Sequence, residues 1–142
     1  MSKYKYVIAP ILALMLGQFI KFLIESIRTR KLVWSRLFNG SGGMPSSHVT
    51  VSWTLLFMFL FNDGVSSKEF AIALVFCLIV AYDAMCIRFE SGKQATVINK
   101  MMKKVPVSNP PHLKEQLGHR LKEVVAGVFL AIAVSLIFSF VI

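Results

Sequence analysis

Four apolar stretches, separated by polar segments, run along the chain. They cover residues 4–27, 49–61, 70–87 and 124–142. The second stretch has 13 residues, and as a helix it would rise about 20 Å, less than a hydrocarbon core of about 30 Å. It crosses a membrane only if the polar turn before it, Pro45 to His48, begins below the membrane surface. The pattern predicts about four transmembrane helices.

A fifth helical pattern lies between the third and fourth stretches. One set of positions at helical spacing holds less polar residues: Gln94, Val97, Ile98, Met101, Met102 and Val105. The positions between them hold four lysines: Lys93, Lys100, Lys103 and Lys104. Beside a bilayer, such an amphipathic helix lies in the interface against anionic headgroups. We expect an all-α integral membrane protein with about four transmembrane helices and one interfacial amphipathic helix, as a single phosphatase-like domain over residues 1–142.

Composition argues against the main alternative, a soluble helical bundle. Hydrophobic residues make up 56% of the chain and charged residues 16%, against about 45–50% and about 25% in soluble proteins. A water-soluble core formed by 142 residues cannot bury so many apolar side chains. We expect a multi-pass protein of the cell membrane.

Positive charge is distributed unevenly along the chain. Of the 16 lysine and arginine residues, 13 lie in or beside the two long polar segments that follow the first and third apolar stretches. The positive-inside rule predicts that both segments are cytoplasmic and that the two termini lie outside. The same charges would also serve a phosphate site, and that alternative leaves the orientation open.

Small residues recur four apart in the first and last apolar stretches. The two stripes are Ala9, Ala13 and Gly17, and Gly127, Ala131, Ser135 and Ser139. Small residues at this spacing let membrane helices approach closely. The stripes predict either packing within the chain, which we favour, or a homodimer.

The segment from Gly42 to His48 places turn-forming and polar residues directly before the second apolar stretch. Gly43 frees the backbone for close approach to a ligand. The amino end of a helix carries unpaired N–H groups and a partial positive charge, which together suit a phosphate. His48 adds a group that delivers a proton near neutral pH. The alternative is a helix cap formed by Ser46 or Ser47, with His48 only interfacial.

A second histidine lies where the last apolar stretch begins. His119 precedes Glu123 by four residues, one helical turn, so the carboxylate can accept one imidazole N–H and leave the other nitrogen nucleophilic. The alternative is a surface pair at a helix start. Upstream, Lys21 and Arg28 are seven residues apart and share one helix face. They predict two cations aimed at one phosphate, or else a salt bridge of both with Glu25.

These motifs resemble those of the divergent branch of the type 2 phosphatidic acid phosphatase and vanadium haloperoxidase superfamily. The superfamily pattern is Lys-x6-Arg-Pro, then Pro-Ser-Gly-His, then Ser-Arg-x5-His-x3-Asp. Lys21 and Arg28 match the first motif, with Thr29 in place of proline. "PSSH", Pro45 to His48, matches the second motif, and "HRLKEVVAG" matches the end of the third.

Two features separate this chain from the parent pattern and place it nearer the divergent branch. Leu113 stands where the third motif has its arginine, and Glu123 replaces the aspartate. The segment "YDAMCIRFESGKQA", Tyr82 to Ala95, is typical of the divergent branch. The resemblance to that branch covers nearly the whole chain.

The resemblance implies a role for each matching residue. His119 would be the nucleophile that forms a phosphohistidine, oriented by Glu123, and His48 would be the general acid. The remaining matches would hold the phosphate oxygens: Lys21, Arg28, Ser46, the backbone N–H of Ser47, and the close-approach glycine Gly43. We add that Arg88 or Lys93 supplies the charge missing at Leu113, and that Asp83 supports the site by pairing with one of those cations.

The implied activity is hydrolysis of a lipid phosphate or diphosphate, of the phosphatidate or polyprenyl type. The alternatives are a non-catalytic protein that binds or transports an anionic lipid, and a structural membrane subunit. We expect neither a metal nor another cofactor, because cationic side chains and N–H groups can stabilise a transferring phosphoryl group. The expected partners are the lipid substrate, membrane lipids and, through the small-residue stripes, a second copy of the chain; nucleic acid is not expected.

Overall fold

The computed structural model describes residues 4–34, 37, 42–105, 111–115 and 117–141, and these residues form helices joined by turns, without a strand. The elements in chain order are α1 (Lys5–Thr29), α3 (Ser47–Asp63), α4 (Lys68–Tyr82), the π-helical turn η1 (Asp83–Ile87), α5 (Arg88–Met102) and α6 (Leu121–Phe140). Each helix begins and ends within a few residues of a predicted apolar or amphipathic stretch. The all-α prediction is confirmed.

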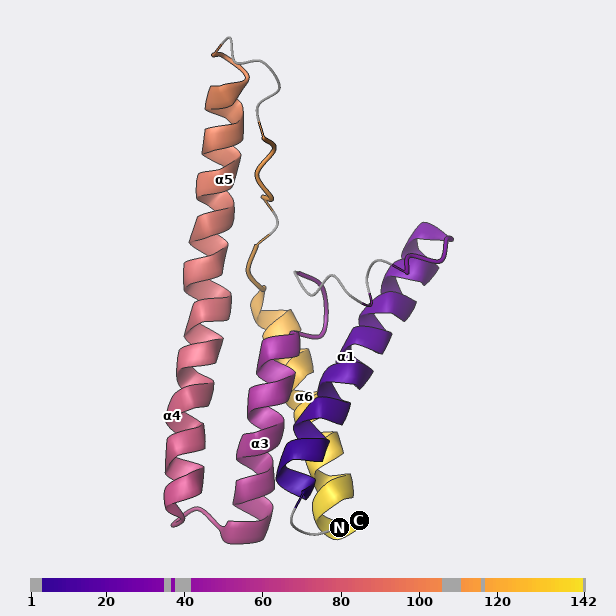
Figure 1. The fold of residues 1–142 in the computed structure, drawn as a ribbon, viewed down its shortest axis with the longest axis vertical. Helices are drawn as coiled ribbons and strands as arrows, with labels where there is room; N and C mark the ends of the chain where they lie inside the picture. The colour runs from indigo at the N-terminus through magenta and orange to yellow at the C-terminus, as the bar shows by residue number, and fades with distance from the viewer. Residues whose placement is uncertain (1–3, 35–36, 38–41, 106–110, 116, 142) are drawn as a thin grey trace.

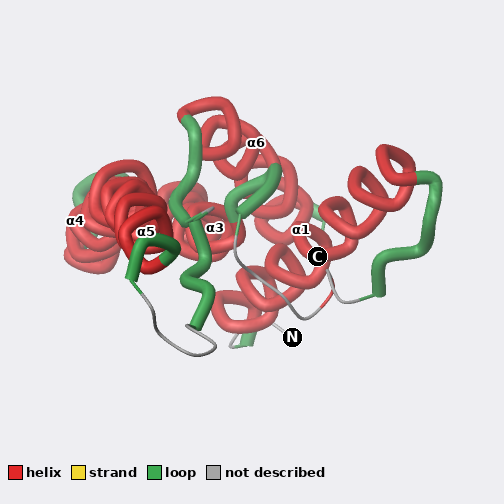
Figure 2. The backbone as a smooth tube through the Cα atoms, turned by 90° about the horizontal axis from the view of Figure 1, so that it is seen from above, coloured by secondary structure: helices red, strands yellow, loops and turns green. Residues whose placement is uncertain are grey.

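The central helix of the bundle is α3. It packs against α1, α4 and α6, and α1 also packs against α6. Both termini lie at one end, together with the short turn between α3 and α4, whereas the two long connections lie at the other end (Figure 1). Towards this second end α1 leans away from the bundle (Figures 1 and 2). The two basic segments are thus on one side, as the sequence predicts.

Within the described residues, three helices are long and apolar enough to cross a membrane: Lys5–Thr29, the continuous helix Lys68–Met102, and Leu121–Phe140. Many large apolar side chains on these helices point outward; Ile72 and Phe129, for example, are 72% and 68% exposed. An outer surface of this kind is stable in hydrocarbon and unstable in water. The fourth predicted span, α3, has 17 residues and runs between the other three.

The last helix packs closely on α3 through small residues. A Cβ atom added at Gly127 would lie 3.0 Å from the Ser46 carbonyl oxygen, so a larger residue there would push the two helices apart by a few tenths of an ångström. Further along, the Ser135 hydroxyl donates to the Thr54 carbonyl oxygen at 3.0 Å. The predicted stripe in the last apolar stretch therefore serves packing within the chain.

The stripe in the first helix has the same use. Ala9 and Ala13 are fully buried, and they form a core cluster with Met58 of α3 and Val134 of α6. Gly17 is also buried. Contacts within the chain therefore account for both stripes. The homodimer stays a prediction, but the stripes are no longer an argument for it.

The amphipathic helix is present, but its direction differs from the prediction. Through η1, α4 and α5 form one rod of 35 residues, about 52 Å long, and from above α5 lies over α4 (Figure 2). Because α4, η1 and α5 follow one another without a break, α5 continues in the direction of α4 and does not turn away from it. Residues 111–115 and 117–118 return alongside α5 (Figure 1), and a Cβ at Gly92 would lie 2.4 Å from the Glu115 carbonyl oxygen.

Candidate functional site

The amino end of α3 is a buried turn with unused donors. Gly43 has φ of +87° with open space where a Cβ would lie, and Ser46 follows as the N-cap residue. The Ser46 N–H donates to the Glu123 carbonyl oxygen at 2.9 Å, which fixes the turn to α6. In the described part of the chain the buried Ser46 hydroxyl has no hydrogen-bond partner. The first-turn N–H groups of α3 also lack partners within the helix.

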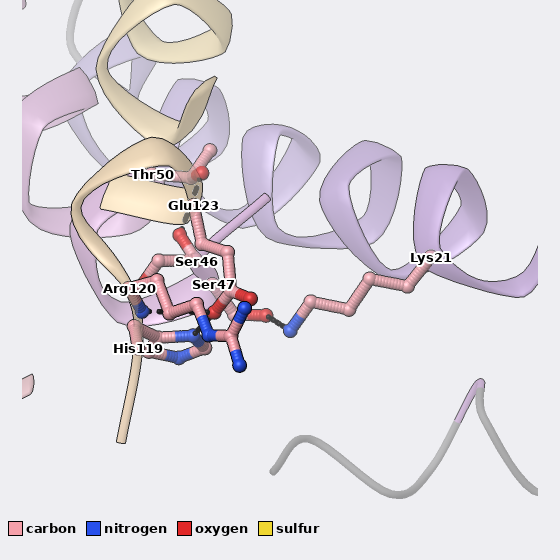
Figure 3. Close-up of polar contacts among 7 residues, drawn as sticks. All are labelled: Lys21, Ser46, Ser47, Thr50, His119, Arg120 and Glu123. Atoms are coloured by element: carbon pink, nitrogen blue, oxygen red, sulfur yellow. Dashed lines mark hydrogen bonds and ion pairs between the residues drawn. The ribbon is translucent and has the colours of Figure 1, made fainter. Parts of the chain in front are cut away.

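A buried lysine from α1 reaches this turn. Lys21 is 4% exposed, and its Nζ donates to the Ser47 Oγ at 2.7 Å (Figure 3). A charged amine is expensive to bury unless it is paired. Lys21 therefore gives this turn a positive charge, and the Ser46 hydroxyl gives it an unused hydrogen-bond donor. Both side chains are buried.

The histidine before α6 is held by two contacts, one from its ring and one from its backbone. His119 Nδ1 lies 2.9 Å from Glu123 Oε2, and the same oxygen accepts the Arg120 N–H at 3.3 Å. The His119 N–H donates to the Ala84 carbonyl oxygen in η1 at 2.9 Å. With Nδ1–H donated to the carboxylate, Nε2 carries the lone pair. The contact with Glu123 thus leaves one defined ring nitrogen, Nε2, for a ligand.

Burial keeps the imidazole of His119 neutral. Desolvation lowers its pKa, and the positive charges of Lys21 and Arg88 lower it further, whereas the hydrogen bond and charge of Glu123 raise it. Burial is the largest of these effects. A neutral ring near pH 7 retains the lone pair that a nucleophile needs.

The other site histidine is more accessible. His48 lies in the first turn of α3 and is exposed, and its backbone carbonyl accepts the Ser52 hydroxyl at 2.9 Å. Arg88, His119 and Lys21 all act on it electrostatically. His48 is therefore near the cationic turn and open on one side, as a group that exchanges protons requires.

Of the two cations proposed to replace the arginine missing at Leu113, Arg88 is the one whose charge acts on both His48 and His119. Its Nε lies 2.5 Å from Asp83 Oδ2, which confirms a partner for Asp83. Lys93 instead pairs with Glu90 at 2.7 Å on the exposed surface of α5. Leu113 itself lies against α5, where its backbone N–H and carbonyl both bond to the Asn99 side chain.

Sequence comparison adds a family to this geometry. The sequence pattern of the divergent PAP2 family matches residues 2–134. The chain belongs to this family. It is also 33% identical to the uncharacterized membrane protein YuiD of Bacillus subtilis (strain 168), over 94% of this chain and 92% of that protein. No solved structure matches the chain.

In this divergent PAP2 chain, most but not all of the predicted site residues are gathered. His119, Glu123, Ser46, Ser47 and Lys21 are joined by hydrogen bonds among themselves or through their backbones (Figure 3). His48 and Arg88 lie within electrostatic range.

Two of the predicted phosphate-binding cations lie apart from this group. Arg28 is exposed in the last turn of α1, and among the described residues it bonds to no other predicted site residue. Its separation follows from the lean of α1. Lys93 is the second cation that lies apart, because its side chain pairs with Glu90 on the exposed surface of α5.

The π-helical turn was not predicted from the sequence. In η1 the Arg88 N–H donates to the Asp83 carbonyl oxygen, a five-residue step in place of the four of an α-helix. The turn brings the Ala84 carbonyl oxygen to His119. Local sequence gives no signal for it, because a π turn is defined by a backbone hydrogen bond and not by the spacing of side chains.

No group of three or more histidine, cysteine or acidic residues suited to a metal occurs within the described ranges. The chemistry open to the gathered residues is that of an oriented neutral imidazole beside a cationic set of donors. Such a set binds a phosphate and stabilises negative charge that develops on it.

Proposed function

We propose that the protein is a membrane phosphatase that hydrolyses a lipid phosphate or diphosphate through a phosphohistidine on His119. The observation that carries the proposal is the 2.9 Å contact between His119 Nδ1 and Glu123 Oε2 in a buried setting. An imidazole held this way directs its other nitrogen to a substrate. Membership of the divergent PAP2 family supports a phosphatase ancestry.

In the first step, the lone pair on His119 Nε2 attacks phosphorus and the bond from phosphorus to the lipid oxygen breaks. His48 gives its proton to that oxygen, so the lipid leaves as an alcohol, or as a lipid phosphate when the substrate is a diphosphate. In the second step, water attacks phosphorus and gives a proton to His48. The P–N bond then breaks, which releases inorganic phosphate and restores both imidazoles.

The phosphate oxygens bind to groups already present at the α3 turn. The free Ser46 hydroxyl and the first-turn N–H groups of α3 donate hydrogen bonds, and Lys21 and Arg88 supply positive charge. Donors fixed before the reaction stabilise a developing charge without reorganisation. Arg88 here takes the place of the cation that Leu113 does not provide.

The site lies at the membrane surface, and we place it on the cytoplasmic side with the two basic segments. Arg88 is the first charged residue after the apolar stretch 70–87, a rise of about 26 Å, close to the thickness of a hydrocarbon core. A lipid headgroup lies at the same depth. Excess lysine and arginine in both long segments favours the cytoplasmic side.

A second candidate function rests on one observation. Arg28 and Lys93 lie apart from the gathered residues, so two of the expected cations do not contribute where a transition state would need them. A site of this kind could bind or transport an anionic lipid without turnover. Release of phosphate distinguishes the two functions.

The experiment is phosphate release by purified protein in nanodiscs that contain either phosphatidate or a polyprenyl diphosphate. His119→Ala should abolish release, because no covalent intermediate can form. His112→Ala is the matched control: His112 is exposed, lies outside the site, and should leave the rate unchanged. Binding of lipid without release in the unaltered protein would favour the second function.

A further inference from the structure

A segment of the chain lies along α5 and leads directly into His119 (Figure 1). We call this segment the strap, and its described residues are 111–115 and 117–118. The pairs that lie close together follow α5 in reverse order: Leu113 with Asn99, Leu117 with Gly92, and Gly118 with Phe89. The strap therefore runs antiparallel to α5, and it ends at the residue before the candidate nucleophile.

Asn99 holds the far end of the strap by its backbone. The Asn99 Nδ2 donates to the Leu113 carbonyl oxygen at 2.8 Å, and the Asn99 Oδ1 accepts the Leu113 N–H at 3.0 Å. The same Nδ2 donates to Glu115 Oε1 at 2.8 Å, and the Thr96 hydroxyl donates to Glu115 Oε2 at 3.0 Å. Asn99 is 7% exposed. Both donors and the acceptor of this buried amide are thus bonded to the strap.

The strap has little slack between Leu113 and His119. Asn99 lies fifteen residues beyond Ala84, whose carbonyl oxygen accepts the His119 N–H, and that length of helix rises about 20–22 Å. The six residues from Leu113 to His119 span at most about 20–22 Å. Because the two lengths agree, holding Leu113 on Asn99 leaves His119 close to one position along the helix.

We propose that Asn99 is a positioning residue for His119 and that it acts through the strap. The proposal rests on the proposed function, because it adds a residue on which attack by His119 depends. With Leu113 held, the strap brings His119 to the Ala84 carbonyl oxygen and to the Glu123 carboxylate together. With Leu113 released, the strap shifts along α5, and a displacement of about 1 Å at a reacting group costs as much as about 10²-fold in rate.

The ionisation of His119 reports its position. The charged and titratable groups that act on it come from four helices: Glu123 of α6, Lys21 of α1, Arg88 of α5 and His48 of α3. Burial is the largest effect on the pKa of His119, and it lowers that pKa. A ring that leaves its buried position gains water, so its pKa rises toward about 6.5, the unperturbed value. This readout does not depend on turnover.

The first test is a histidine NMR titration of the full chain in nanodiscs. The chain has three histidines: His119 is the candidate nucleophile, His112 lies in the strap, and His48 on α3 is the internal reference. Asn99→Asp places a second carboxylate beside Glu115, whose pKa is lowered chiefly by its hydrogen bond with Asn99. Repulsion should release the strap and raise the pKa of His119. Over about 20 Å the new charge itself is largely screened, because the Debye length is about 10 Å.

Two further variants control this result. Combining Asn99→Asp with Glu115→Gln exchanges donor and acceptor between the two positions, so the strap should be held again and the pKa of His119 should return most of the way. Gln94→Leu changes an exposed amide on the same helix and should leave that pKa unchanged. If Asn99→Asp does not fold, Thr96→Val, which removes only the hydroxyl bond to Glu115, should shift the pKa in the same direction by a smaller amount; no shift would then overturn the inference.

Phosphate release gives the second readout. Asn99→Asp should lower kcat by about 10- to 100-fold and leave KM nearly unchanged, because the donors at the amino end of α3 and Lys21 are not displaced. A residue that served stability alone would lower the melting temperature and leave both kcat and the pKa of His119 as they are. That result would overturn the inference, and so would a rise in pKa that Glu115→Gln does not reverse.

The two readouts separate failure of this inference from failure of the proposed function. If the unaltered protein releases no phosphate but the pKa of His119 responds to Asn99→Asp and recovers with Glu115→Gln, Asn99 positions the ring and the catalytic function is wrong. If the unaltered protein and Asn99→Asp release phosphate at the same rate, the function stands and the role of Asn99 is wrong.

Discussion

Lys21 of α1 and Ser47 of α3 are joined by a 2.7 Å hydrogen bond across 26 residues of sequence. Because the ammonium is the donor, the Ser47 oxygen is the acceptor, and the serine proton remains available to a third group. A phosphate oxygen is a suitable third group. The pair thus links a buried charge to a hydroxyl donor at the amino end of α3.

Replacing the lysine tests this link. Lys21→Met keeps the length and apolar stem of the side chain but removes the charge, so phosphate binding and kcat/KM should fall by about 10- to 100-fold, the worth of one charge-assisted hydrogen bond. Phosphate release in nanodiscs measures it. Lys31→Met, at an exposed position beyond α1, is the control, and an equal loss there would indicate a general effect of net charge.

The two histidines should differ in how they depend on the leaving group. His48→Ala should slow hydrolysis of a lipid alkyl phosphate by about 10²–10⁴-fold, the usual worth of general acid catalysis. An aryl phosphate leaves without a proton and should be affected much less. Rates for both substrates measure this dependence, and equal losses on the two would contradict the assignment of His48 as the acid.

As the pH is lowered, kcat/KM should fall only at a pH below the ordinary pKa of histidine. Burial lowers the pKa of His119, so the nucleophilic neutral form persists below about pH 6.5, the unperturbed value. The acid limb of kcat/KM against pH measures this pKa. Glu123→Gln removes a group that raises the pKa, so the limb should move to still lower pH while the rate falls.

The control for this profile is another carboxylate on the same side of the molecule. Glu90 is exposed and pairs with Lys93, and Glu90→Gln should leave the limb where it is. A limb that lies above pH 6.5 in the unaltered protein would mean that a different group titrates.

Vanadate should inhibit the reaction and metal chelators should not. Vanadate adopts the five-coordinate geometry of a phosphoryl transition state, and such analogues bind more tightly than substrates, by at least about 10²-fold. Inhibition constants for vanadate and for inorganic phosphate, with and without EDTA, measure the difference. Loss of activity with EDTA would point to a metal-dependent mechanism.

Gly118 should be far less replaceable than Gly64. Both have positive φ, +84° and +82°, but a Cβ at Gly118 would lie 2.6 Å from the Phe89 backbone nitrogen whereas nothing lies within 4 Å at Gly64. Alanine at either position meets a backbone penalty of about 1–3 kcal/mol, because positive φ is unfavourable for a residue with a Cβ, and Gly64, with ψ of 167°, lies in a region that essentially only glycine adopts. Overpacking adds about 1–3 kcal/mol at Gly118 alone.

Thermal unfolding of the two alanine variants measures this difference in stability. Gly118→Ala should also lower phosphate release, because His119 is the next residue. Equal melting temperatures would contradict the close approach between residue 118 and α5.

Much of the fold follows from the hydrophobic pattern, because lipid-facing helices must present apolar residues along their full length. The four predicted stretches all correspond to helices, and the small-residue stripes correspond to real helix contacts such as Gly127 on Ser46. The direction of α5 was not predictable from periodicity. Lysine-rich amphipathic helices lie flat on membranes or extend from them, and only the uninterrupted backbone at Ile87 decides between these arrangements.

The candidate site was predictable where its residues are close in sequence. His119 and Glu123 are one helical turn apart, and their contact follows from that spacing. Arg28 shares a helix face with Lys21, but the lean of α1 removes it from the site, and no local pattern encodes a helix tilt.

The π-helical turn Asp83–Ile87 also determines where this segment can change its length. Each residue of an α-helix adds a rotation of about 100° and a rise of about 1.5 Å, whereas the π turn holds one residue more than an α-helical turn, because the Arg88 N–H bonds to the carbonyl five residues earlier. Loss of one residue within the turn would restore the α-helical step and leave α5 facing the same way, so Gly92 would still meet the backbone of Glu115 and Leu117 closely. Loss of one residue elsewhere between α4 and Gly92 would rotate α5 by about 100°. A single codon lost there would separate α5 from the backbone that precedes His119.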